Sequence, residues 1–185
     1  MSTLTDRDRT ALVVIDMQQA VVANGHEVER VVANIDTLIA RARSGDTPVI
    51  WVQHADDEMP SGSAGWEFVP ELAPASGEAI IAKRFGDSFE ETDLESTLSD
   101  LGVGRLIVTG AQTDACVRST LHGAVARGYD TVLVGDAHTT EDMREWGSPL
   151  SPEQAIAYTN MYWNFTAAPG RTCATVTTDE VDFAT

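Results

Sequence analysis

A chain of 185 residues with 43% hydrophobic residues is long enough to bury a core and has the composition of an ordinary globular domain. The net charge of −17 argues against nucleic acids and anionic membranes as partners. It would attract a cationic small molecule, but acidic surfaces chiefly provide solubility or reflect an acidic host proteome. No apolar run approaches the ~20 residues that span a bilayer. The polar N-terminal residues predict no secretory signal, so we expect a cytoplasmic protein without disulfides.

The hydrophobic pattern alternates between strands and helices along the chain. Short apolar runs predict strands at residues 11–16, 49–54, 79–82, 105–109, 131–134 and 173–177. Apolar residues at three- and four-residue spacing predict helices at residues 27–43, 93–101, 113–127 and 152–163. Residues 55–78 and 135–140 are expected to be loops, the first long enough for a lid or binding loop. The pattern predicts a single domain over residues 1–185, a Rossmann-like three-layer α/β/α sandwich around a mostly parallel six-stranded sheet.

Cys116 is expected in the first turn of a helix that directly follows a buried strand. Thr113 or Asp114 occupies the N-cap position, and apolar side chains follow at helical spacing. Unpaired N–H groups and the positive end of the helix dipole favour a thiolate there, which predicts a lowered pKa for the thiol. A free cysteine is also often a small buried hydrophobic residue, so partners must decide whether Cys116 is a nucleophile.

Two such partners follow other predicted strands. Asp16 ends the first strand, and Lys83, the only lysine in a chain with eleven arginines, follows the third. Because ligands bind at the carboxyl ends of parallel strands, we expect Asp16, Lys83 and Cys116 at one edge of the sheet. There Asp16 can accept and return the thiol proton, and Lys83 can hold both negative groups. The alternatives are a strand-end cap for Asp16 and a snorkelling surface amine for Lys83.

Three motifs follow one another along the chain: Val-Ile-Asp16-Met-Gln18, Lys83-Arg-Phe85-Gly-Asp-Ser-Phe89 and Gly110-Ala-Gln-Thr-Asp-Ala-Cys116-Val. In their residues, order and spacing they resemble the motifs of a known family, the isochorismatase-like cysteine hydrolases. The resemblance implies that Asp16 is the general acid/base, Lys83 the electrostatic partner and Cys116 the nucleophile of a covalent intermediate. It also implies a cis peptide bond at Ala111–Gln112, an oxyanion hole formed by the backbone N–H groups of Gln112 and Cys116, and a homodimer or larger homo-oligomer.

The resemblance also indicates a branch within the family. Nicotinamidase-like members bind a metal through an Asp-x-His pair and a further His, whereas here His54 is followed by Asp56, with no other histidine until His122. This predicts a hydrolase without a metal or other cofactor. The segments at residues 65–72 and 135–140 most resemble metal-free amidases of the streptothricin hydrolase kind, which open a lactam in a polycationic antibiotic. The implied reaction is cleavage of an amide or lactam C–N bond in a small molecule, a cationic one being one option.

Ring side chains near the same strand ends are candidates for the wall of the substrate pocket. The predicted substrate-binding residues are His54, Trp66, Phe85 and Phe89. Aromatic residues in loops also pack into cores, and a histidine also satisfies local hydrogen bonds, so a structural role is the alternative for each. His138 is an alternative base for Cys116, in a Cys–His dyad.

Other functions stay open from the sequence alone. Within the family they are isochorismatase-type cleavage of a vinyl ether and nicotinamidase-like hydrolysis. A non-catalytic binding protein on the same fold would leave Cys116 inert toward iodoacetamide. A phosphatase of the haloacid-dehalogenase type also has an Asp after its first strand, but Asp16-Met17-Gln18 lacks the second Asp of that motif. Such a phosphatase would lose its activity in EDTA.

Overall fold

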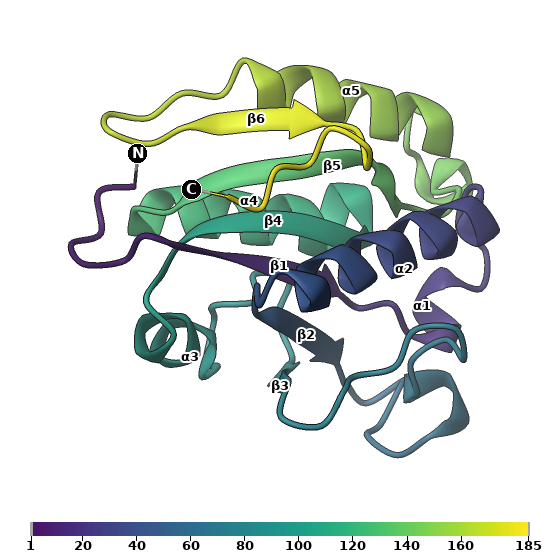
Figure 1. The fold of residues 1–185 in the computed structure, drawn as a ribbon. Helices are drawn as coiled ribbons and strands as arrows, with labels where there is room; N and C mark the ends of the chain where they lie inside the picture. The colour runs from purple at the N-terminus through teal and green to yellow at the C-terminus, as the bar shows by residue number, and fades with distance from the viewer. Residues whose placement is uncertain (1, 185) are drawn as a thin grey trace.

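A six-stranded sheet forms the centre of the computed structural model, which describes residues 2–184 (Figure 1). The strands stand in the order β3-β2-β1-β4-β5-β6, and all five neighbouring pairs are parallel. Their bounds are β1 (Arg9–Ile15), β2 (Val49–His54), β3 (Ala79–Lys83), β4 (Val103–Ala111), β5 (Asp130–Thr139) and β6 (Cys173–Val176). The predicted sheet is confirmed.

Helices cover both faces of this sheet, which confirms the predicted three-layer sandwich. One face packs against α2 (Val28–Ser44), and the other against α3 (Leu94–Asp100), α4 (Arg118–Arg127) and α5 (Pro152–Asn164). The shorter elements are α1 (Gln19–Val22), the 3₁₀ turns η1 (Ala64–Trp66) and η3 (Arg144–Trp146), and the π-helical turn η2 (Thr113–Val117). Within residues 2–184, no helix is long and apolar enough to cross a membrane.

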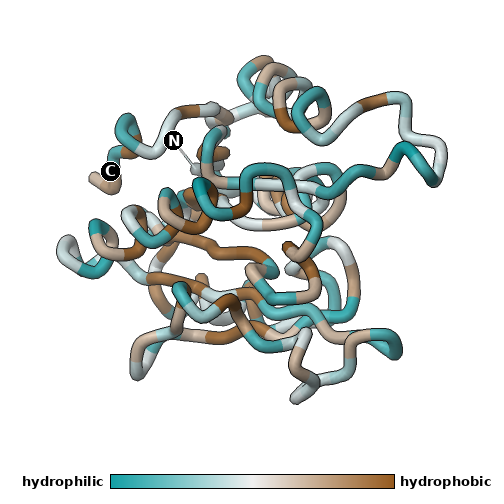
Figure 2. The backbone as a smooth tube through the Cα atoms, turned by 90° about the vertical axis from the view of Figure 1, so that its right-hand side faces the viewer, coloured by the Kyte–Doolittle hydropathy of each residue, from teal (hydrophilic) through white to brown (hydrophobic). Residues whose placement is uncertain are grey.

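The continuous apolar run of β1 serves both faces of the sheet. Leu12 and Val14 belong to the core on the α2 side, whereas Ala11, Val13 and Ile15 belong to the core on the other side, because successive side chains of a strand alternate. All five are 0% exposed, and Figure 2 shows apolar segments of the chain in the interior. A strand that is buried on both faces is fixed in register, so the residue that follows it is also fixed in place.

β4 and β5 differ from the predicted elements near their carboxyl ends. β5 continues through residues 135–139, which the sequence predicts as a loop, so that prediction is wrong. The pairing of β4 with β5 shifts register after Val108, and Gly110 then pairs with His138. Gly110 has φ +115°, and a Cβ atom there would lie 2.0 Å from the carbonyl oxygen of Ile15. Only glycine lets β4 pass this close to the end of β1.

Candidate active site

Three side chains from different strand ends meet at the carboxyl edge of the sheet. Asp16 follows β1, Lys83 ends β3 and Cys116 follows β4 within η2. The Lys83 Nζ lies 2.7 Å from Asp16 Oδ2 and 3.2 Å from Cys116 Sγ. The structure thus brings these three predicted residues together. Asp16 and Lys83 are buried and Cys116 is half-buried, and we call the three the buried cluster.

Asp16 is the turning point of the chain at the end of β1. Its φ of +49° lies in the left-handed region, which Asp tolerates better than most residues. The residue is 1% exposed, and its Oδ1 has no hydrogen-bond partner within the described residues. Burial raises the pKa of this carboxyl, and the Lys83 ammonium lowers it by less. A carboxylate with a raised pKa and an unpaired oxygen is a stronger base than an exposed aspartate.

Cys116 lies in the π-helical turn η2 that precedes α4, rather than in the first turn of an α-helix. Burial raises the pKa of its thiol to about 11; the Asp16 carboxylate raises it too, while the Lys83 ammonium lowers it. The predicted lowering of this pKa is therefore wrong, because the sulfur is poorly solvated and lies beside a carboxylate. The resting group is a thiol, which must lose its proton as the sulfur attacks.

Lys83 is an ammonium group despite its burial. Its side chain is 0% exposed. Burial lowers its pKa, but Asp16 and Cys116 raise it by more, so the net direction is upward. The Nζ also donates to the carbonyl oxygen of Phe85 at 3.1 Å and lies 3.4 Å from His54 Nδ1. The one lysine of the chain is thus the centre of the site.

The turn that leads to Cys116 is fixed by its own backbone. The peptide bond between Ala111 and Gln112 is cis. The Gln112 carbonyl oxygen accepts the N–H groups of Ala115 and Val117 at 3.1 Å each, and its side chain donates to the carbonyl of Val21 at 3.2 Å. The oxyanion-hole role of the Gln112 and Cys116 N–H groups stays a prediction.

His138 supports this turn from β5. Its Nδ1 lies 2.8 Å from Thr113 Oγ1, and its Nε2 lies 2.8 Å from Asn160 Oδ1. Burial lowers the pKa of His138 to about 4, so the ring is neutral, with Nε2–H donating to Asn160 and the Thr113 hydroxyl donating to Nδ1. Both ring nitrogens are occupied, which leaves no support for the alternative of a Cys–His dyad.

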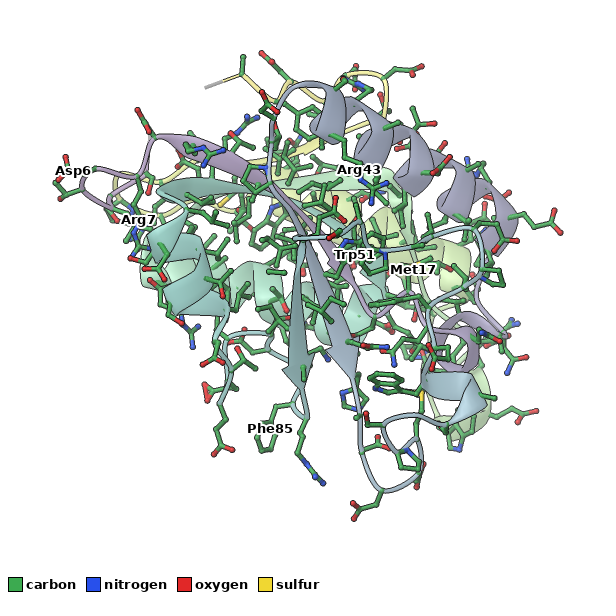
Figure 3. All side chains as sticks on the ribbon, turned by 60° about the horizontal axis from the view of Figure 1, so that its bottom comes forward. Asp6, Arg7, Met17, Arg43, Trp51 and Phe85 are labelled. Atoms are coloured by element: carbon green, nitrogen blue, oxygen red, sulfur yellow. The ribbon has the colours of Figure 1, made fainter. Side chains whose placement is uncertain are left out.

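The predicted pocket residues lie in different places. Phe85 is 48% exposed and projects beyond the end of β3 (Figure 3). Trp66 is half-buried, and its carbonyl oxygen accepts from the side chains of Gln18 and Gln53 at 2.8 and 3.0 Å. The ring of His54 is bound to other protein groups. Contact of Phe85, Trp66 or His54 with substrate stays a prediction.

Phe89 is corrected from pocket wall to core. It is only 6% exposed and belongs to the core on the α3–α5 side. Its ring lies 5.7 Å from that of Tyr129, and the guanidinium of Arg127 lies 4.7 Å from its centroid. The loop after β3 turns this side chain inward, which its spacing from Phe85 does not reveal.

Two residues of the site were missed by sequence reasoning. Gln18 is 0% exposed and binds the backbone of His54 twice, with Nε2 donating to its carbonyl at 2.9 Å and Oε1 accepting its N–H at 2.8 Å. Asp56 Oδ2 lies 3.0 Å from His54 Nε2. Gln18 stands in the first family-like motif, which was the available signal; nothing in the sequence marks Asp56 beyond its spacing from His54.

The sequence and fold were compared with known proteins. A sequence profile described as the isochorismatase domain matches residues 10–167, a span that includes the whole buried cluster. The chain belongs to the isochorismatase family.

Individual members of the isochorismatase family show how far the likeness extends. Streptothricin hydrolase of Streptomyces noursei is 35% identical over 140 residues, which are 72% of this chain and 55% of that protein. The chain thus spans about half the length of the streptothricin hydrolases that it matches. The isochorismatase family protein YddQ of Bacillus subtilis is 29% identical over 92% of this chain and 97% of its own. The crystal structure of an isochorismatase from Pseudomonas putida superposes with a TM-score of 0.77 at 27% identity, covering 95% of this chain and 91% of that one.

In this family member a cavity of about 530 Å³ adjoins the buried cluster at Lys83. It is lined mainly by the loop after β2 and the segment after β3. Its charged lining residues are Asp56, Asp57, Lys83, Arg84, Glu90 and Glu91. We call this the acidic cavity. Phe85 also lines it, so an exposed ring and four carboxylates share this cavity, whose lining includes Lys83 of the buried cluster but neither Asp16 nor Cys116. Within residues 2–184, no group of three or more His, Cys, Asp or Glu side chains could hold a metal ion.

Proposed function

We propose that this isochorismatase-family chain is a metal-independent cysteine hydrolase that cleaves an amide or lactam C–N bond of a small molecule. The observation that carries the proposal is the Lys83 ammonium, 2.7 Å from the Asp16 carboxylate and 3.2 Å from the Cys116 sulfur. A base, a cation and a nucleophile that meet at one edge of the sheet are the groups that acyl transfer requires. The similarity to streptothricin hydrolase is compatible with this reaction.

In the first half of the proposed reaction, Cys116 Sγ forms a bond to the substrate carbonyl carbon as its proton passes to Asp16. The raised pKa of Asp16 favours this transfer, and Lys83 balances the negative charge that moves between the two groups. The N–H groups of Gln112 and Cys116 stabilise the oxyanion, each such donor being worth ~10²–10³ in rate. Asp16 then gives the proton to the leaving nitrogen, the C–N bond breaks and a thioester remains.

In the second half, water resolves the thioester. The Asp16 carboxylate takes a proton from the water as its oxygen bonds to the thioester carbon. The C–S bond then breaks, the carboxylic acid leaves, and the sulfur recovers the proton from Asp16. The cycle restores the resting thiol and consumes one water.

The charge of the acidic cavity supports a cationic substrate. Four carboxylates line this cavity, those of Asp56, Asp57, Glu90 and Glu91. The two cations of the lining are already paired, Lys83 with the buried Asp16 at 2.7 Å and Arg84 with Asp57 at 3.3 Å. The excess of carboxylates lowers the energy of a positively charged group there, and Phe85 offers its ring face for a cation–π contact.

The test is hydrolysis of an amide panel by three forms of the protein. The substrates are streptothricin, nicotinamide and simple carboxamides, with isochorismate as the vinyl ether comparison. Wild type and the matched control Cys173→Ala are expected to hydrolyse at least one amide, in the presence of EDTA as well. Cys116→Ala is expected to lose at least about 10³-fold in kcat, and mass spectrometry is expected to find the acyl group on Cys116.

Each contrary result has its own meaning. Hydrolysis retained by Cys116→Ala contradicts the covalent mechanism. Cleavage of isochorismate alone favours the vinyl ether reaction, and loss of amide hydrolysis in EDTA favours a nicotinamidase-like metal enzyme. No turnover together with a Cys116 that iodoacetamide does not alkylate favours the binding protein.

We also propose that the protein self-associates through the outer face of α5. Tyr158, Met161 and Phe165 are 56%, 48% and 80% exposed there. Glu153 is the one charged residue of this helix, so two acidic copies can meet at this face with little repulsion. Sedimentation velocity is expected to show a dimer or larger species, and Met161→Glu is expected to shift it toward monomer. An unchanged sedimentation coefficient in Met161→Glu contradicts this interface.

The cytoplasmic location stays a prediction from the sequence.

A further inference from the structure

The Lys83 ammonium has more acceptors around it than protons to give. Asp16 Oδ2, Phe85 O, Cys116 Sγ and His54 Nδ1 lie 2.7, 3.1, 3.2 and 3.4 Å from its Nζ. An ammonium has three N–H groups, so four acceptors compete for three donors. The His54 contact is the longest of the four, which makes His54 the acceptor in reserve.

The two ring nitrogens of His54 have different partners, and these partners determine the tautomer of the neutral ring. Its Nε2 lies 3.0 Å from Asp56 Oδ2, while Asp56 Oδ1 accepts the backbone N–H groups of Glu58 and Met59 at 2.9 and 2.7 Å. The hydrogen bond with His54, helped by these N–H groups, holds the pKa of the Asp56 carboxyl below its usual range. An ionised carboxylate accepts the Nε2–H, so Nδ1 presents its lone pair to the ammonium of Lys83.

The backbone holds His54 in place for this contact. His54 and Lys83 are paired in the register of β2 and β3, and the N–H of Ala55 donates to the Lys83 carbonyl at 3.0 Å. Gln18 binds both the N–H and the carbonyl of His54. A ring fixed at its backbone, and at Nε2 by Asp56, has little freedom to turn toward a ligand.

We propose that His54, oriented by Asp56, is a positioning residue that holds the Lys83 ammonium between Asp16 and Cys116 throughout the reaction. When the Cys116 sulfur bonds to the substrate carbon, it becomes a poor hydrogen-bond acceptor. The Lys83 N–H that it accepted then donates to His54 Nδ1 instead. The ammonium then stays in place while Asp16 carries the proton. This inference rests on the proposed function for its catalytic meaning, but the geometry that it asserts is independent of the substrate.

The test therefore includes a readout that needs no substrate. In a Cys173→Ala background, the alkylation rate of Cys116 by iodoacetamide is followed at pH 8 and over pH 6–9. Below the pKa of the thiol, this rate follows the thiolate fraction. The titratable groups that act on the thiol are Asp16 and Lys83, with His54 and Asp56 behind Lys83.

Four variants separate positioning from other roles. His54→Phe keeps a ring without an acceptor, and His54→Gln restores an acceptor. Asp56→Asn removes the carboxylate that orients the ring, and the matched control Glu58→Gln removes a charge from the same exposed loop. The alkylation rate at pH 8 is expected to fall about tenfold in His54→Phe and less in Asp56→Asn, to recover largely in His54→Gln, and to be unchanged in Glu58→Gln. On a substrate, kcat is expected to fall about tenfold in His54→Phe with KM within about twofold.

Two results overturn the proposal. One is a raised KM with an unchanged alkylation rate in His54→Phe, which makes His54 a substrate contact. The other is an alkylation rate in Asp56→Asn equal to that of the control; this exposed loop carboxylate can be changed even where His54→Phe does not fold. Failure of every amide in the panel contradicts the proposed function alone, because the alkylation rates still decide the role of His54.

Discussion

Lys83 of the buried cluster and Arg84 of the acidic cavity are neighbours in sequence but lie in very different surroundings. The Lys83 side chain is 0% exposed and lies 2.7 Å from Asp16, which is 1% exposed. The Arg84 side chain is 66% exposed and lies 3.3 Å from Asp57, which is 98% exposed. Water screens the charges of Arg84 and Asp57, whereas both Lys83 and Asp16 are shielded from water. A cation beside a carboxylate therefore sets the chemistry in one region and only tunes the affinity for ligands in the other.

The sharpest way to break this comparison is to make the same change in both regions. Asp16→Asn is expected to reduce kcat by about 10³-fold or more, since it removes the proton acceptor for the thiol. Asp57→Asn is expected to change kcat/KM by less than about tenfold, mainly through KM, because its charge is screened. Steady-state kinetics on the best amide of the panel measures both. Similar losses in the two variants would show that the buried cluster has no special role.

The pH profile sharpens the same contrast. The proposed mechanism needs Asp16 as a carboxylate, and burial raises its pKa above the ordinary value of 3.8. Activity is therefore expected to be present above that raised pKa and to be lost as the pH falls through it. The acid limb of kcat/KM should lie above 3.8, persist in Asp57→Asn and disappear in the residual activity of Asp16→Asn. A limb that survives in Asp16→Asn belongs to another group.

Stability gives the next largest effect. Lys83→Met leaves Asp16 buried without a counter-charge, which is expected to lower the free energy of unfolding by about 3–5 kcal/mol. Arg84→Met removes an exposed pair and is expected to cost less than about 1 kcal/mol. Urea unfolding at neutral pH measures both. In the double variant Lys83→Met/Asp16→Asn much of the loss should return; a loss that persists points to packing of the lysine stem instead.

His138 is a third buried titratable group, and it hydrogen-bonds to Thr113 in the turn that carries Cys116. Its pKa is about 4 in the folded state and 6.5 is the ordinary value, so the unfolded chain binds a proton more readily between these pH values. The stability contributed by neutral His138 is fully present above pH 6.5 and is lost as the pH falls toward 4. The free energy of unfolding is expected to drop by up to about 3 kcal/mol over this range in wild type, and by much less in His138→Asn. Urea unfolding at pH 6.5 and at pH 4 measures the drop in both proteins. An equal drop in wild type and in His138→Asn would assign it to groups other than His138.

The buried cluster could be predicted from the sequence because parallel strands bring its three residues to the same edge of the sheet. Short apolar runs show where the parallel strands end, and the carboxyl ends of parallel strands share one edge of the sheet. Asp16, Lys83 and Cys116 could be placed together on that basis. The pKa of Cys116 could not be predicted, since it depends on how much water and which charges surround the sulfur.

The surroundings of the cluster depend on contacts between segments that are far apart in sequence. The hydrogen bonds from Gln18 to His54 and from His54 to Asp56 join the end of β1 to the loop after β2, and no local pattern encodes them. The extension of β5 past Gly135 depends on its pairing with β4 beyond a register shift. Phe89 was misplaced because the direction of a loop side chain follows the path of the loop.

The smallest expected effect contrasts Phe85 with Phe89. Phe85 is 48% exposed in the acidic cavity, so Phe85→Ala is expected to raise KM for a cationic amide by about two- to tenfold, the loss of one cation–π or apolar contact. Its backbone carbonyl still accepts from Lys83, so kcat should stay within about twofold. Phe89→Ala is the matched comparison, because the same truncation at 6% exposure should cost about 3–5 kcal/mol of stability and leave KM unchanged where the protein stays folded. A fall in kcat without a change in KM in Phe85→Ala would mean that this ring supports the buried cluster rather than the ligand.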